Sequence, residues 1–401
     1  MNIQKTNLRK SLVASLLVVA LPTMGFVAGC HTQATQAATP KTQTHQQSNV
    51  SVEFNQLDKT DQRALTRMAE TYPLFASQAE KIWRSNFRMD QDIVYLVRSD
   101  GKQDLHGFVI NHPKPESLAQ AKSVKLPSGF KLPPVYQVAG LNHKQLKQVE
   151  NYEFEYPLGG ESVFMLRYVP EKIDRFIAPV GHDWSLYVAH EDFHRIQERK
   201  WGYVENDQDT RDYDFSANQL ALIALEDKAL VAALKADSPG ARKTFIQHFV
   251  KVRGERIRLY GQKIKHLDGA QERAEGTARY IEHRLGELLG SKETNLATFA
   301  EAIEYESMPE ESIRDNSAFG RFYATGAGQA RLLDLTVPGW KADLEKGATQ
   351  YQLLAKHFPA TNISLDQVKQ AHDFGKILPW AKRAAQVAKK EPKDIFGHDH
   401  S

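Results

Sequence analysis

The chain has 401 residues, of which 41% are hydrophobic and 25% charged, and its formal net charge is +3 at pH 7. The first 30 residues hold Lys5, Arg9 and Lys10 and no acidic residue, which leaves 49 basic and 49 acidic residues in the rest of the chain. A balanced charge gives no global attraction to DNA or RNA, so we expect no nucleic-acid partner. The length is enough for one large or two ordinary domains.

The N-terminus has the pattern of an export signal. An apolar run from Leu12 to Val27 follows the three basic residues and ends in Val-Ala-Gly-Cys at position 30. This resembles a bacterial lipoprotein signal with its lipobox, which implies that residues 1–29 are removed and that Cys30 receives diacylglycerol. An ordinary cleaved signal and an uncleaved apolar anchor are the alternatives.

Cys30 is the only cysteine, so the mature chain has no disulfide and no thiolate metal ligand. Residues 30–50 are rich in Gln, Thr, Ala and Ser and predict a flexible tether between the lipid and the folded part. The signal implies a location in the bacterial cell envelope, anchored to the membrane by lipid. The residue after Cys30 is His31, not the Asp that would retain a lipoprotein in the inner membrane. In a Gram-negative cell, this resembles a lipoprotein that is sorted to the outer membrane and faces the periplasm.

Residues 51–180 predict a strand-rich part. A helix over 62–85 precedes strand-like runs that are separated by Pro and Gly clusters. We expect the last run to be an edge strand along which an extended peptide substrate docks by main-chain hydrogen bonds. The runs cover residues 92–98, 107–111, 135–138, 152–156 and 162–169.

Residues 181–202 predict a helix that carries the sequence His190-Glu191-Asp192-Phe193-His194. Residues four apart lie on one helix face, so both imidazoles can reach one metal ion while Glu191 lies beside them. This is the zincin H-E-x-x-H pattern, in which the two His residues bind zinc and the Glu is the general base. The alternative is that the two histidines bind no metal and are ordinary core or surface residues. The helix ends are expected at an Asp183 N-cap and at Gly202, and its apolar stripe consists of Leu186, Ala189, Phe193 and Ile196.

The chain from 203 to 390 is predicted to be mainly helical, with helices near 216–236, 241–267, 271–289, 317–335 and 365–374. Four aspartates between positions 207 and 214 lack the spacing of a calcium loop, so we expect a solvated acidic turn there. Residues 391–401 are expected to be a frayed tail. The whole pattern predicts an α+β fold, with the site between a sheet-bearing N-terminal half and a helical C-terminal half.

Glu275 lies in the sequence Glu-Gly-Thr-Ala-Arg-Tyr, whose E-G-x-A-x-Y core resembles the second zinc helix of the gluzincin metallopeptidases, such as the aminopeptidase N-like enzymes. The resemblance implies that Glu275 is the third zinc ligand, with Glu272 as a rival and Glu282 as a possible outer-shell group. Small residues at Gly276 and Ala278 are expected to let the two zinc helices approach closely.

The sequence departs from the aminopeptidase N-like family, because Glu275 follows His194 by 81 positions and no G-A-M-E-N signature is present. The resemblance is therefore to the gluzincin clan rather than to a particular aminopeptidase. The Gly-Ala-rich helix that starts near Tyr323 is similar to the one that follows the zinc site in these enzymes. It implies that Tyr323, or as a second choice Tyr280, donates a hydrogen bond to the developing oxyanion.

The function expected from these features is a lipid-anchored zinc (Zn²⁺) metallopeptidase that hydrolyses peptide or protein substrates. An alternative of a different class is a non-catalytic envelope lipoprotein that binds proteins or peptides and keeps a structural zinc site. A third possibility is a protein that keeps the fold without binding metal. Structural zinc usually takes four protein ligands, often cysteines, and the mature chain has no cysteine beyond the lipidated one. This favours a catalytic zinc site over a structural one.

Overall fold

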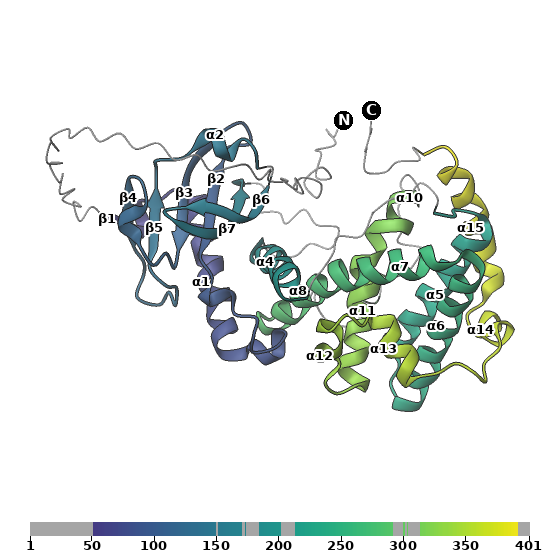
Figure 1. Ribbon diagram of the computed structural model, residues 1–401. Helices are drawn as coiled ribbons and strands as arrows, with labels where there is room; N and C mark the ends of the chain where they lie inside the picture. The colour runs from purple at the N-terminus through teal and green to yellow at the C-terminus, as the bar shows by residue number, and fades with distance from the viewer. Residues whose placement is uncertain are drawn as a thin grey trace, which may run out of the picture.

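The computed structural model describes residues 51–149, 151–170, 173, 184–201, 213–291, 300, 303 and 313–391. The expected signal, tether, lipidated Cys30 and C-terminal tail beyond 391 lie outside the described residues, as do Asp183, Gly202 and the first three of the four loop aspartates. The fold is α+β: a mixed sheet forms the N-terminal half, and the C-terminal half is mostly helical (Figure 1).

A seven-stranded sheet with the order β1-β4-β5-β3-β2-β7-β6 forms the N-terminal half. The β1–β4 and β2–β7 pairs are parallel and the other pairs antiparallel. All five predicted strands are confirmed, whereas β1 and β4 are additional because each is short and mostly exposed, without an apolar run. The strands are β1 Ser51–Glu53, β2 Val94–Ser99, β3 Asp104–Ile110, β4 Ala121–Lys125, β5 Val135–Val138, β6 Tyr152–Leu158 and β7 Glu161–Tyr168.

The prediction that the last strand is the edge strand was wrong. β7 lies inside the sheet, where Phe164 pairs with Val94 of β2 and Val163 pairs with Tyr156 of β6. The physical reason is in the sequence: residues 163–166 are all apolar and all buried, which is typical of a strand covered on both faces rather than of an edge. The edge strand on this side is β6, joined to β7 by Gly159 and Gly160, both at positive φ as a tight hairpin turn requires.

Both faces of the central strands β2, β3 and β7 are buried. One face packs against the main core of the molecule, and the other forms a smaller apolar cluster with Leu118 and Leu146. Alternate residues of a strand point to opposite faces, so neighbouring side chains contribute to different clusters. The main core receives Val94, Leu96, Phe108, Ile110, Phe164 and Leu166, and the smaller cluster receives Tyr95, Val97, Val109, Val138, Val163 and Met165.

The predicted helices are confirmed with small changes of boundary. The long segment expected over 241–267 is divided at Gly261, whose φ of +80° breaks the helix. Two π-helical turns, η4 Glu272–Gly276 and η7 Asn316–Gly320, precede α8 and α11. The helices are α1 Lys59–Ile82, α2 His143–Leu146, α4 Trp184–Trp201, α5 Ala217–Lys235, α6 Pro239–Tyr260, α7 Gln262–Gln271, α8 Thr277–Leu288, α10 Ile313–Asp315, α11 Arg321–Thr336, α12 Trp340–Glu345, α13 Gln350–His357, α14 Leu365–Ala371 and α15 Phe374–Ala388. None of the described helices is long and apolar enough to cross a membrane.

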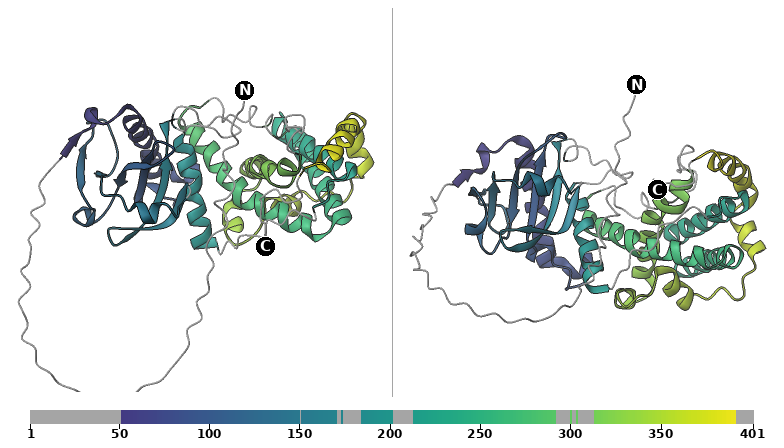
Figure 2. Two further views of the ribbon diagram at one scale, coloured as in Figure 1. Left: turned by 90° about the horizontal axis from the view of Figure 1, so that it is seen from above. Right: turned by 45° about the horizontal axis from the view of Figure 1, so that its top comes forward.

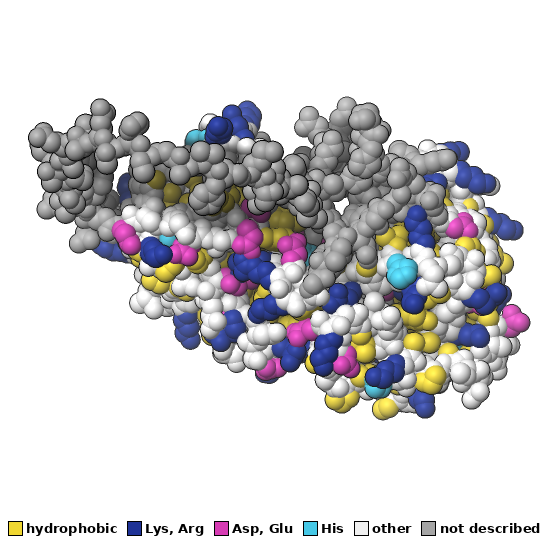
Figure 3. All heavy atoms as spheres, viewed as in Figure 1, with side chains coloured by type: hydrophobic (Ala, Val, Ile, Leu, Met, Phe, Trp, Pro, Cys, Tyr) yellow, Lys and Arg dark blue, Asp and Glu magenta, His cyan; other side chains and the backbone are white. Residues whose placement is uncertain are grey.

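Helix α4 lies where the two halves meet, beside α1 and α8 (Figures 1 and 2). Trp83, at the end of α1, joins the halves, because its ring contacts Phe193 of α4 at 5.3 Å, Tyr280 of α8 at 6.0 Å and Trp340 of α12 at 5.4 Å between centroids. One apolar core therefore runs from the sheet through α4 into the helical half. On the face shown in Figure 3, Lys and Arg side chains are spread over the described surface rather than gathered in one place.

Candidate metal centre

His190, His194 and Glu275 come together at the border of the two halves. The Nε2 atoms of the two histidines are 3.1 Å apart, and Oε2 of Glu275 lies 3.4 Å from the first and 3.3 Å from the second. The three predicted metal ligands, which come from segments 81 positions apart, thus present one nitrogen or oxygen atom each to a single point. His190 and Glu275 are buried, and His194 is partly exposed.

Helix α4 places the two histidines. Its predicted stripe, Leu186, Ala189, Phe193 and Ile196, is buried in the main core, so the orientation of the helix is fixed by apolar packing. With that stripe inward, positions 190 and 194 face Glu275 one turn apart, and their rings meet edge to face at 4.8 Å. Glu191 is adjacent and 6% exposed.

Glu275 projects from the π-helical turn η4, which lies between α7 and α8. A π-helical turn inserts one residue into a helix and redirects the side chains around it, and such turns are frequent at functional sites. The rival Glu272 lies in the same turn but points away from the histidines. Its carboxylate accepts two hydrogen bonds from Arg253 and one from Thr325, so it belongs to a buried ion network rather than to the metal centre.

The small residue Gly276 has a different role from the one predicted. A Cβ atom on Gly276 would lie 2.5 Å from the Cα atom of Gly326 in α11. The close approach that Gly276 permits is therefore to α11, and the expectation that it serves the contact with α4 was wrong. The contact still fixes the turn that carries Glu275.

Both imidazoles are held by hydrogen bonds at Nδ1. His190 Nδ1 is 2.6 Å from Oε1 of Glu282, whose other oxygen accepts from Arg279 at 2.7 Å. His194 Nδ1 is 2.9 Å from Oε1 of Gln197. Since a carboxylate or carboxamide oxygen only accepts, each Nδ1 carries the proton, and in a neutral ring Nε2 keeps its lone pair. Glu282 thus lies behind His190, in the place that an outer-shell group would take.

The charges around the histidines favour a cation between them. Burial alone lowers the pKa of His190, but the carboxylates of Glu282 and Glu275 raise it to about 10. The pKa of Glu275 is held well below its usual range, because both imidazoles outweigh the effect of burial. Burial raises the pKa of Glu191. In the absence of metal, protons on the imidazoles neutralise this acidic centre, and a divalent cation can take their place.

The residues fit a zinc ion. Oε2 of Glu275 and Oε2 of Glu191 are buried and receive no well-formed hydrogen bond, which is costly unless a cation or water binds them. Two imidazole nitrogens and one carboxylate oxygen are the ligand set of catalytic zinc sites that keep a fourth position for water.

A second group of possible metal ligands consists of Asp58, Asp61 and His106, and it fits a metal poorly. The Asp61 carboxylate already accepts hydrogen bonds from Tyr168 at 2.6 Å and from His106 at 2.8 Å. The Arg98 guanidinium, 3.6 Å away, also balances its charge.

Tyrosines surround the centre. Tyr323 stacks on His190 at 5.9 Å between centroids, and burial together with the charges of Glu275 and Glu191 raises its pKa. Tyr280, the second choice for an oxyanion donor, lies elsewhere: its hydroxyl donates to Asp334 at 2.7 Å and its ring packs on Trp340. Tyr323 therefore lies beside the centre and stays the candidate for an oxyanion donor, whereas Tyr280 is too far into the helical half to contact it.

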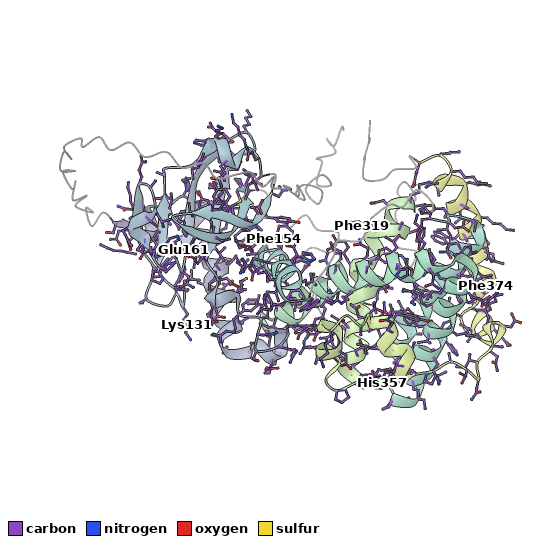
Figure 4. The ribbon with its side chains drawn as sticks, viewed as in Figure 1. Lys131, Phe154, Glu161, Phe319, His357 and Phe374 are labelled. Carbon is purple, nitrogen blue, oxygen red and sulfur yellow. The ribbon has the colours of Figure 1, made fainter. Side chains whose placement is uncertain are left out.

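Two further tyrosines near the centre were not anticipated. Tyr187 precedes Glu191 by one helical turn and stacks on His190 at 6.5 Å, a neighbour that helical spacing would have revealed. Tyr152 of β6 lies close enough to Glu191 and Glu275 for their charges to raise its pKa, after the larger effect of burial. In Figure 4 the labelled Phe154 and Phe319 lie on the two sides of the border between the halves; Phe154 stacks on Tyr152, and Phe319 packs on Tyr323.

Comparison of the chain with protein-family models, with curated proteins and with solved structures found no match. The resemblance to gluzincins therefore rests on the residues of the motif and on the geometry of the centre.

Proposed function

We propose that this protein is a zinc-dependent metallopeptidase of the gluzincin type, anchored by lipid in the bacterial envelope. The observation that carries the proposal is the convergence of His190 Nε2, His194 Nε2 and Glu275 Oε2, with the buried carboxylate of Glu191 beside them. The zincin assignment of the fold rests on the same convergence and on the order of a sheet, the H-E-x-x-H helix and a helical half. The envelope location rests on the N-terminal sequence alone.

His190, His194 and Glu275 would hold the metal. When bound, zinc lowers the pKa of water and polarises a carbonyl group as a Lewis acid. Glu191 would take the proton of the attacking water and pass it to the leaving amine as general base. Tyr323, whose hydroxyl is protonated at neutral pH, would donate a hydrogen bond to the carbonyl oxygen as negative charge develops there.

A peptide substrate would add to the edge of the sheet at β6. The described part of the chain pairs β6 with β7 on one side only, so the main-chain groups on its other edge could pair with an extended peptide. Tyr152 lies on this strand and faces the charges of Glu191 and Glu275, so the edge passes the proposed catalytic centre.

A catalytic site is favoured over a structural one by the number of ligands. Among the residues that the structure describes, three ligand atoms converge and a fourth protein ligand does not join them. Structural zinc is closed by four protein ligands, whereas catalytic zinc keeps one position for water. A purely binding lipoprotein with a structural zinc would require that fourth ligand.

Replacing the base and not the ligands tests the proposal. In the chain from Ser51 onward, which contains every described element, Glu191→Gln should retain zinc and lose hydrolysis of a peptide library by on the order of 10²–10⁴-fold. Glu70→Gln is the control, since it removes an exposed carboxylate that pairs with Arg67 on the surface of α1 and should leave both properties unchanged. Full activity in Glu191→Gln would eliminate the mechanism.

A further inference from the structure

Gln197 connects the two metal-binding segments. It is fully buried on α4, three residues after His194. Its Oε1 lies 2.9 Å from His194 Nδ1, and its Nε2 donates to the backbone carbonyl of Ala274 at 3.0 Å. Ala274 is the residue before Glu275 in η4. One carboxamide therefore touches a ligand from the H-E-x-x-H helix and the backbone that carries the third ligand.

We propose that Gln197 is a positioning residue of the metal centre, which fixes the tautomer of His194 and the placement of Glu275 together. This inference rests on the proposed zinc site and goes beyond it, because Gln197 is neither a ligand nor a base.

The orientation of the carboxamide follows from its partners. The Ala274 carbonyl only accepts hydrogen bonds, so the amide nitrogen of Gln197 must face it, and Oε1 must then face His194. An oxygen at that place requires a proton on Nδ1 of the imidazole. Nε2 is then the nitrogen left to bind metal, and it is the atom that lies 3.3 Å from Oε2 of Glu275. The reversed amide would oppose two oxygens across a buried contact.

The hydrogen bond from Gln197 to the Ala274 carbonyl supports the turn η4. Gln350 also supports this turn, through a 2.7 Å hydrogen bond from its Nε2 to the carbonyl of Glu272. Gln350, however, comes from α13 and makes its other side-chain contact with Thr277, not with a ligand. Gln197 ties the same turn to α4. A shift of α4 relative to η4 would therefore disturb its hydrogen bonds at both ends.

The two histidines are held differently. His190 is oriented by the carboxylate of Glu282, which is paired with Arg279, whereas His194 is oriented by a neutral amide. Three carboxylates, Glu191, Glu275 and Glu282, already surround the histidines. A neutral acceptor at position 197 fixes the His194 ring without adding a fourth negative charge, and the amide nitrogen also donates to Ala274, which an ionised carboxylate could not do.

The test compares Gln197→Leu and Gln197→Glu with Gln350→Leu, a buried amide that supports the same turn without touching a ligand. Zinc dissociation constants are measured at one pH by competition with a chelating dye, and the solvent exchange of the His194 Nδ1 proton is followed by NMR in the metal-free protein. Gln197→Leu should weaken zinc binding by on the order of 10–100-fold and lose the protected Nδ1 proton. Gln197→Glu, which keeps the acceptor and loses the donor, should keep the proton protected and lose less affinity. Gln350→Leu, which removes one hydrogen bond from the turn but no contact with a ligand, should lose less affinity than Gln197→Leu and keep the Nδ1 proton protected.

Wild-type zinc affinity in both Gln197 variants would overturn the inference and leave the zinc site standing. An equal loss in Gln350→Leu would overturn it as well, because support of the turn would then explain the effect. A wild-type protein that binds no zinc would overturn both the proposed function and this inference. If Gln197→Leu does not fold, the isosteric Gln197→Glu decides, since zinc binding and proton protection equal to wild type would show that the donor to Ala274 has no positioning role.

Discussion

Replacing Gly326 with alanine tests the close contact that holds the turn bearing Glu275. The new Cβ atom would lie 2.5 Å from the carbonyl oxygen of Glu272 and 2.8 Å from Cα of Gly276. Both are backbone atoms within helical segments, so neither can rotate away. To reach ordinary van der Waals contact, α11 and η4 must separate by roughly 1 Å, an overpacking that costs about 1–3 kcal/mol. Alanine recovers about 0.5–1 kcal/mol of helix propensity, so the net loss of stability should lie between about 0 and 2.5 kcal/mol, near 1 kcal/mol at the middle of these ranges.

Gly254→Ala is the matched control. Gly254 is also in the interior of a helix, α6, but its new Cβ would meet only the Tyr351 hydroxyl at 3.5 Å, an ordinary contact. This variant should gain about 0.5–1 kcal/mol. Urea unfolding of the metal-free chain from Ser51 onward measures both, and zinc affinity should fall in Gly326→Ala only. Equal stability of the two variants would refute the account of this helix contact.

Three further outcomes are expected at the metal centre. Tyr323→Phe should retain zinc and lower kcat on peptides by on the order of 10²-fold, because it removes the donor to the oxyanion. An unchanged kcat would contradict this role of Tyr323. Glu282→Gln should weaken zinc binding by on the order of 10–100-fold in a dye competition, and wild-type affinity would exclude Glu282 as the group that orients His190. In the metal-free protein, the raised pKa of His190 contributes stability that is fully present below its unfolded value near 6.5 and is lost as pH rises toward about 10. Urea unfolding should therefore show a loss of up to a few kcal/mol between pH 7 and 10 that His190→Asn lacks, and identical pH profiles would contradict it.

The sequence predicted those parts of the centre that depend on local periodicity. The spacing of His190 and His194 and the apolar stripe of α4 fix one helix face, which the structure confirms. Glu282 follows Glu275 by seven residues, two helical turns, which made it an outer-shell candidate, but its contact with His190 was not predicted. Tyr187 and Gln197 follow the same rule, at one turn from Glu191 and His194, and were overlooked although the spacing was present.

The remaining features depend on contacts between distant segments. The last strand along the chain is not the last strand in the sheet, because β6 lies outside β7, and the apolar run in β7 indicated an interior strand. Tyr152 lies near Glu191 only because β6 is at the edge beside α4. The partner of Gly276 is a second glycine, Gly326, fifty residues later, and neither residue identifies the other in a single sequence.

Metal content tests the central claim most directly. Mass spectrometry of the chain from Ser51 onward, compared with His190→Ala and Glu275→Ala, should find close to one zinc per wild-type chain and almost none in either variant. The same zinc content in all three proteins would place the metal elsewhere, and a wild-type chain free of zinc after reconstitution would contradict the metallopeptidase.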